Sequence, residues 1–175
     1  MSELDRLRWQ LDISWSLLSL HVADLSDEEA LWEPGSPCWT VRPQPDGTWK
    51  ADFATTEPDP VPMLTIGWVM WHIGFWWSTA HANTFGPGPA VDLMKAGETT
   101  PWPGSVTEAT AWLTDCHSRW QESLDGVTDL DSRERTAWFI PDVTLGHVLG
   151  WANIELMKNA AEIGSIRHLY ACRTS

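Results

Sequence analysis

The sequence contains few cysteines. Only three of its 175 residues are cysteine, and Cys38, Cys116 and Cys172 lie far apart with no C-x-x-C pair among them. An odd number of widely spaced cysteines excludes a disulfide framework and is typical of a reducing compartment. We therefore expect a cytoplasmic protein.

Basic residues are also scarce. Eleven Lys and Arg residues stand against twenty-four Asp and Glu residues, which gives a formal net charge of −13. A surface of this charge repels the phosphates of nucleic acids and of anionic membranes. We therefore expect neither a nucleic-acid partner nor a membrane partner.

Long hydrophobic runs and several familiar catalytic motifs are missing as well. The richest apolar run, Leu64 to Phe75, is too short to span a membrane and contains His72. The first residues, Met1 to Arg8, are charged and are not followed by the apolar segment of a signal peptide. The sequence has no G-x-S-x-G motif, no H-E-x-x-H motif and no glycine-rich phosphate loop, which disfavours those hydrolases and nucleotide-binding folds.

Tryptophan is unusually abundant. Fourteen tryptophans are spread from Trp9 to Trp151 and are not concentrated in one segment. This distribution favours a core built from large rings. Some of the rings can also line a flat aromatic pocket, because indole offers apolar area together with one N–H donor.

Apolar residues recur at steps of three and four along much of the chain, which predicts amphipathic helices. The predicted helices cover residues 4–25, 65–83, 105–124 and 144–170. Four such helices with long connections predict an all-α protein, a four-helix bundle forming a single domain over residues 1–175.

The connections carry their own signals. Ser26 to Glu29 has the S-x-x-E form of a capping box and predicts a short helical turn. Residues 33–62 contain seven prolines, which exclude a long helix, so we expect an ordered loop packed on the bundle. We expect another irregular connection over residues 91–103 and a short extended piece over residues 138–141.

Three polar residues fall within or beside the predicted apolar stripes. Helical geometry places His72 near the centre of the second stripe, among Trp68 and Trp76. Asn159 lies near the centre of the fourth stripe, and Glu155 lies one turn earlier at its edge. A buried imidazole or carboxylate needs a partner, which can be a metal ion or a hydrogen-bonding group of the protein. His21, beside the first stripe, is a further candidate for the same cavity.

Three stretches of the sequence resemble the DinB-like family, in particular its actinobacterial members. Residues 31–43, LWEPGSPCWTVRP, resemble the segment after the family's first helix. Residues 65–73, TIGWVMWHI, resemble its histidine-bearing second helix, and residues 153–170 resemble its fourth helix. The three stretches occur in the family's order and span most of the chain.

This resemblance implies a divalent metal, nickel or zinc, held by three histidines in the family. His72 matches the first of these positions, whereas the other two fall on Glu155 and Asn159, and Lys158 stands where histidine is often found. The resemblance therefore suggests His72, Glu155 and Asn159 as metal ligands. It also suggests a transferase or hydrolase that uses a low-molecular-weight thiol, which the metal would hold as a thiolate.

Two hypotheses remain open at this point. The chain is either a metal-dependent enzyme of this kind, or a metal-free descendant that binds a small apolar or aromatic molecule between its helices. In the second case we expect Trp68, Trp71, Trp76 and Trp151 to line the pocket. In either case a homodimer is plausible, because exposed helix faces of bundles often pair.

Overall fold

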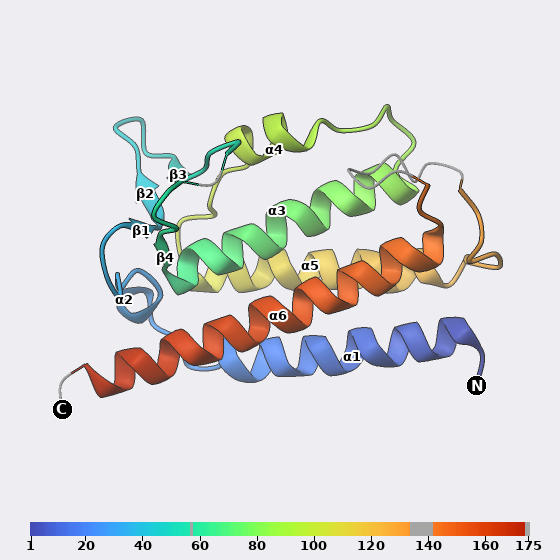
Figure 1. Cartoon of the computed structure of the whole chain (residues 1–175), viewed down its shortest axis with the longest axis horizontal. Coiled ribbons are helices and arrows are strands. Elements are labelled where there is room, and N and C mark those ends of the chain that lie inside the picture. Colours follow the sequence, from blue (N-terminus) through green and yellow to red (C-terminus); the bar gives the residue numbers. More distant parts are fainter. Residues whose placement is uncertain (57, 134–141, 174–175) are drawn as a thin grey trace.

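Four long helices make up most of the computed structural model, which describes residues 1–56, 58–133 and 142–173. They are α1 (Glu3–Val22), α3 (Ile66–Phe85), α5 (Val106–Leu124) and α6 (Leu145–Cys172). Figure 1 shows them side by side, with α1 packed along α6 and with α3 against α5 and α6. The prediction of a mainly helical protein is confirmed.

The helix ends follow local capping rules. Three predicted starts are confirmed by side chains that accept the backbone N–H three residues ahead, namely those of Thr65, Ser105 and Thr144. α3 ends at Phe85, two residues later than predicted, and Gly86 forms its C-cap. α1 ends at Val22 and not at Leu25, because the chain turns away at Ala23 with an extended backbone.

The proline-rich connection between α1 and α3 is ordered and carries short strands. The strands are β1 (Cys38–Trp39), β2 (Val41–Pro43), β3 (Trp49–Ala51) and β4 (Met63–Leu64). β1 pairs in parallel with β4, and β2 pairs antiparallel with β3. Figure 1 places all four strands beside the start of α3. The absence of a long helix was predicted correctly, but the two small sheets were not predicted.

The two remaining helices are short. Ser26 caps α2 (Asp27–Ala30), as its S-x-x-E pattern predicted. The prediction of an irregular connection over residues 91–103 is wrong in part, because α4 (Leu93–Thr99) lies within it and is capped by Asp92. The short extended piece predicted for residues 138–141 lies outside the described residues.

Large rings fill much of the core, as the abundance of tryptophan suggested. Trp71, Trp77 and Trp120 are almost completely buried. The indole N–H of Trp71 donates to the Thr100 carbonyl, and that of Trp120 donates to the Trp77 carbonyl. Within the described ranges, no helix combines the length and the apolar character needed to cross a membrane.

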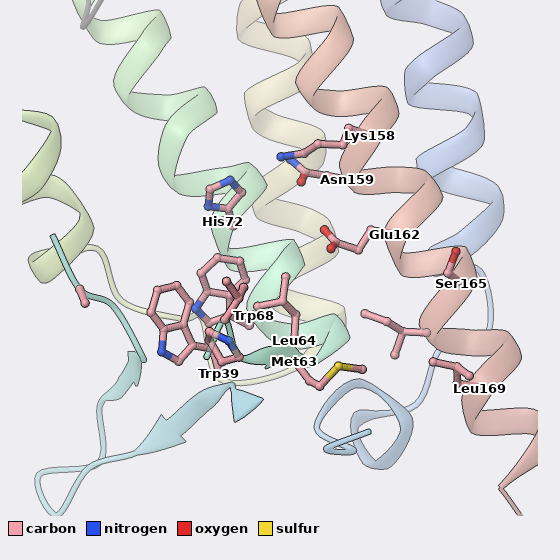
Figure 2. Close-up of a pocket in the computed structure, with 14 residues that line it drawn as sticks. Trp39, Met63, Leu64, Trp68, His72, Lys158, Asn159, Glu162, Ser165 and Leu169 are labelled. Carbon is pink, nitrogen blue, oxygen red and sulfur yellow. The ribbon is translucent and has the colours of Figure 1, made fainter. Parts of the chain in front are cut away.

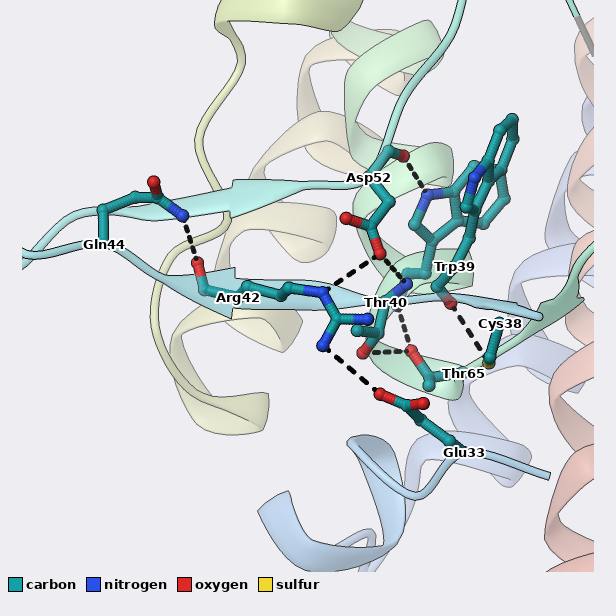
Figure 3. A network of polar contacts seen from close by, with 9 residues as sticks. Glu33, Cys38, Trp39, Thr40, Arg42, Gln44, Asp52 and Thr65 are labelled. Carbon is teal, nitrogen blue, oxygen red and sulfur yellow. Dashed lines mark hydrogen bonds and ion pairs between the residues drawn. The ribbon is translucent and has the colours of Figure 1, made fainter. Parts of the chain in front are cut away.

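Polar contacts tie the strand region to α3. Figure 3 shows Asp52 accepting from the Thr40 backbone N–H at 3.0 Å and pairing with Arg42 at 3.3 Å. The Asp52 carbonyl accepts from the Trp68 indole N–H at 2.7 Å. This contact fixes the position of Trp68, whose ring forms part of the cavity described next.

Candidate functional site

A cavity of about 660 Å³ opens between α3, α6 and the segment that contains β4. Most of its wall is apolar, and the main apolar side chains are those of Trp39, Met63, Leu64, Trp68, Ile166 and Leu169. Figure 2 shows four polar side chains pointing toward one another across it: His72 from α3, and Lys158, Asn159 and Glu162 from α6.

His72 belongs to a helix that is buried on nearly all sides. Fifteen of the twenty α3 residues are buried, and His72 is one of the few that are partly exposed. It faces the cavity and not the centre of the helical core, which corrects the predicted position. Its ring stacks on Trp68, with 5.0 Å between the ring centroids and 13° between the planes.

The imidazole of His72 is kept neutral by its surroundings. Burial lowers its pKa to about 4, and the positive charge of Lys158 contributes to this shift. A neutral imidazole offers one ring nitrogen as an acceptor and one as a donor.

Asn159 lies in the cavity wall opposite His72. It is only 1% exposed, as the position near the centre of the apolar stripe predicted. Within the described part of the chain its Nδ2 has no hydrogen-bond partner, although the atom is buried. An unpaired buried donor costs about 1–3 kcal/mol, so such a group is unusual without a functional reason.

Glu155 does not contribute to the cavity wall. Its carboxylate pairs with the Lys158 ammonium at 2.9 Å, and its side chain is 21% exposed. Of the three predicted ligands, His72 and Asn159 therefore line the same cavity, whereas Glu155 is paired with Lys158 outside it.

Sequence reasoning missed Glu162, which is the carboxyl group that does line the cavity. Burial raises its pKa, the Lys158 ammonium partly opposes this, and the Glu155 carboxylate raises it further. Glu162 lies three residues after Asn159 and seven after Glu155, so helical spacing, which places all three on one face of α6, was the signal that could have found it.

The aromatic part of the wall also differs from the expectation. Trp68 lines the cavity as predicted, but Trp71 and Trp76 are buried in the core. Trp151 packs against Trp76 with 4.9 Å between ring centroids. The second tryptophan ring in the cavity wall is that of Trp39, from the proline-rich connection, and its centroid lies 5.3 Å from that of Trp68.

His21 is also placed elsewhere. It lies in a separate depression together with Glu29, Gly164 and Arg167.

The polar groups of the cavity do not match the metal chemistry implied by the family resemblance. In residues 1–56, 58–133 and 142–173, no three His, Cys, Asp or Glu side chains are grouped so that they could hold a metal ion. His72, Asn159 and Glu162 offer one imidazole, one amide and one carboxyl, and burial raises the pKa of that carboxyl. The nearby ammonium of Lys158 also opposes a cation. This set does not fit a nickel or zinc site, for which imidazole and thiolate are the preferred ligands.

The fold and the cavity define a helical protein with an open, largely apolar site between two long helices. The profile of the DinB superfamily matches residues 10–163. Because this match covers most of the chain, the protein belongs to the DinB superfamily. No curated protein and no solved structure shows significant similarity to it. The superfamily is generally metal-binding and enzyme-like.

Proposed function

We propose that this chain is a four-helix bundle of the DinB superfamily that binds a small organic molecule between α3 and α6 without a divalent metal. The buried, unpaired Nδ2 of Asn159 in the cavity wall is the observation that carries the proposal. A ligand that accepts a hydrogen bond would satisfy this donor, which no described protein group does.

The size and lining of the cavity support a small organic ligand. Its volume of about 660 Å³ lies within the range of roughly 300–1,000 Å³ that is usual for such sites. Trp39, Trp68 and His72 provide ring faces, and a few polar groups converge on the same space. Apolar walls with few polar groups are the usual composition of small-molecule sites.

The positions that would hold the metal support a metal-free site. Glu155 and Asn159 occupy the places where the family resemblance implies histidines, and Glu155 is engaged by Lys158. The choice of His72, Glu155 and Asn159 as ligands of a metal-dependent, thiol-using enzyme stays a prediction. A metal measurement distinguishes it from the proposal made here.

The test begins with the full chain purified without a nickel column. Elemental analysis and titration with Zn²⁺ and Ni²⁺ should find no stoichiometric metal and no tight binding. A one-to-one metal that is lost in His72→Ala would overturn the metal-free proposal and support the enzyme hypothesis.

The second part of the test is a ligand screen with a matched pair of variants. NMR spectra that follow the tryptophan indole N–H signals should show small aromatic molecules shifting Trp39 and Trp68. Ser165→Trp places a ring in the cavity wall and should abolish these shifts. Ser118→Trp should keep them, because Ser118 lies on α5 and, like Ser165, is exposed and donates to a carbonyl four residues earlier. Shifts that persist in Ser165→Trp would locate binding elsewhere.

A further inference from the structure

One turn of α6 presents a cation and an unpaired amide donor to the same cavity. Lys158 and Asn159 are adjacent in sequence, and both line the wall opposite the aromatic rings. Figure 2 shows the ends of both side chains directed toward His72. Two donors on one side of a cavity, one of them charged, form a receptor for an acceptor group that carries negative charge.

The positive charge of Lys158 affects the titratable groups that line the cavity. Burial lowers the pKa of His72 and raises that of Glu162, and the Lys158 charge adds to the first shift and opposes the second. Its partner Glu155 lies outside the wall, and the pair is partly exposed, with 55% of the lysine side chain open to solvent. Exposed pairs of this kind are weak, at about 0–1 kcal/mol, so the ammonium can turn to another anion at little cost.

The other side of the cavity is suited to a planar apolar group. The rings of Trp68 and His72 stack at 5.0 Å, and Trp39 lies 5.3 Å from Trp68. Met63 and Leu64 extend this apolar surface along β4. Aromatic rings gain stabilisation from offset or edge contacts with other rings at such spacings.

The lining residues favour a ligand with one negative charge over a ligand with two. Among the described residues that line the cavity, Lys158 is the only Lys or Arg, and Glu162 also faces the space. A group with two negative charges, such as a phosphate monoester, would meet one ammonium and a carboxyl that resists it. A single carboxylate matches one ammonium and one amide N–H.

We propose that the cavity binds a small aromatic carboxylate, with its carboxylate between Lys158 Nζ and Asn159 Nδ2 and its ring against Trp68. This proposal rests on the proposed function and names the class of ligand for that site. Lys158 then provides at this position the positive charge that a metal ion provides elsewhere in the superfamily.

The test compares an acid with its neutral analogue. Naphthalene-2-carboxylate and naphthalene-2-carboxamide have nearly the same shape, and their affinities for the full chain are measured by calorimetry. The carboxylate should bind at least ten-fold more tightly at low ionic strength. Lys158→Met should remove this preference, Lys158→Arg should retain most of it, and Lys95→Met, an exposed change on α4, should leave it unchanged.

The possible outcomes separate this inference from the proposed function. If acid and amide bind the cavity equally, or if Lys158→Met keeps the preference, the carboxylate inference is wrong and the site remains a neutral pocket. The same holds if other molecules from the screen bind the cavity while aromatic carboxylates do not. If no molecule of any class shifts the cavity signals, the proposed function itself fails.

Discussion

The Lys158 ammonium and the Glu155 carboxylate lie 2.9 Å apart on one face of α6, and only the lysine reaches the cavity wall. The pair therefore controls how much positive charge the cavity presents. It also explains how Glu155 can occupy a ligand position implied by the family resemblance without being a free carboxylate.

Replacing Glu155 by glutamine should strengthen the binding of an aromatic carboxylate by several-fold, because it releases Lys158 and removes a competing negative charge. It should also lower the pKa of Glu162, which the Glu155 carboxylate raises. Calorimetry measures the first effect, and a carbon-detected NMR titration of the glutamate carboxyls measures the second. Asp115→Asn, which breaks a pair with Arg119 on α5, is the control and should change neither. Weaker binding in Glu155→Gln would mean that Glu155 itself contacts the ligand.

Replacing the two buried asparagines of α6 by leucine should affect the free energy of unfolding differently. Asn159 Nδ2 has no partner in the described chain, so Asn159→Leu should leave the free energy of unfolding unchanged or raise it by about 1 kcal/mol. Asn153 Nδ2 donates to the Leu7 carbonyl at 2.8 Å and joins α6 to α1, so Asn153→Leu should cost about 1–3 kcal/mol. Urea unfolding of the ligand-free protein measures both. Equal losses would show that Asn159 is satisfied within the protein and would remove the main support for the proposed site.

The stability of the protein should fall between pH 7 and pH 5 because of His72. Its pKa of about 4 lies below the value of about 6.5 for an unfolded chain, so the unfolded state binds more protons in this interval. The contribution of His72 to this loss should be roughly 2 kcal/mol. Urea unfolding at both pH values should show a smaller loss in His72→Gln than in the wild type. The control is His168→Gln, an exposed change on α6, which should lose as much stability as the wild type. An equally large loss in His72→Gln would mean that the His72 imidazole is solvated and that the prediction is wrong.

Arg167 should be one of the most important polar residues for stability. Its guanidinium donates to the largely buried Glu29 carboxylate at 2.9 Å and to the carbonyls of His21 and Ala23 at the end of α1. Arg167→Met leaves Glu29 without its partner and should cost about 3 kcal/mol or more. Arg119→Met, which breaks an exposed pair, should cost less than about 1 kcal/mol. Thermal and urea unfolding give both values, and similar losses would mean that Glu29 is solvated after the change.

Local signals predicted the helices well. A hydroxyl placed before an apolar run caps a helix wherever the run occurs, so Ser105 and Thr144 marked two starts correctly. α4 escaped prediction because it has only seven residues, one of them glycine, and its apolar pattern is too short to show a period.

The candidate site was predictable only in part. Spacing singled out His72 and Asn159, and both line the cavity. Trp39 was not assigned to it, because nothing in a proline-rich connection indicates where the segment will fold back. Its position depends on the pairing of β1 with β4 at the start of α3.

The sequence by itself determined the helical class, most helix boundaries, the acidic surface and the face of α6 that carries Glu155, Asn159 and Glu162. Only the tertiary structure decided which carboxyl lines the cavity with His72. Glu155 and Glu162 are seven residues apart, so they point in directions that differ by only about 20° but lie roughly 10 Å apart along the axis. Periodicity fixes the angle of a side chain around its helix, whereas the sliding position of α6 against α3 depends on how their side chains interlock in the core.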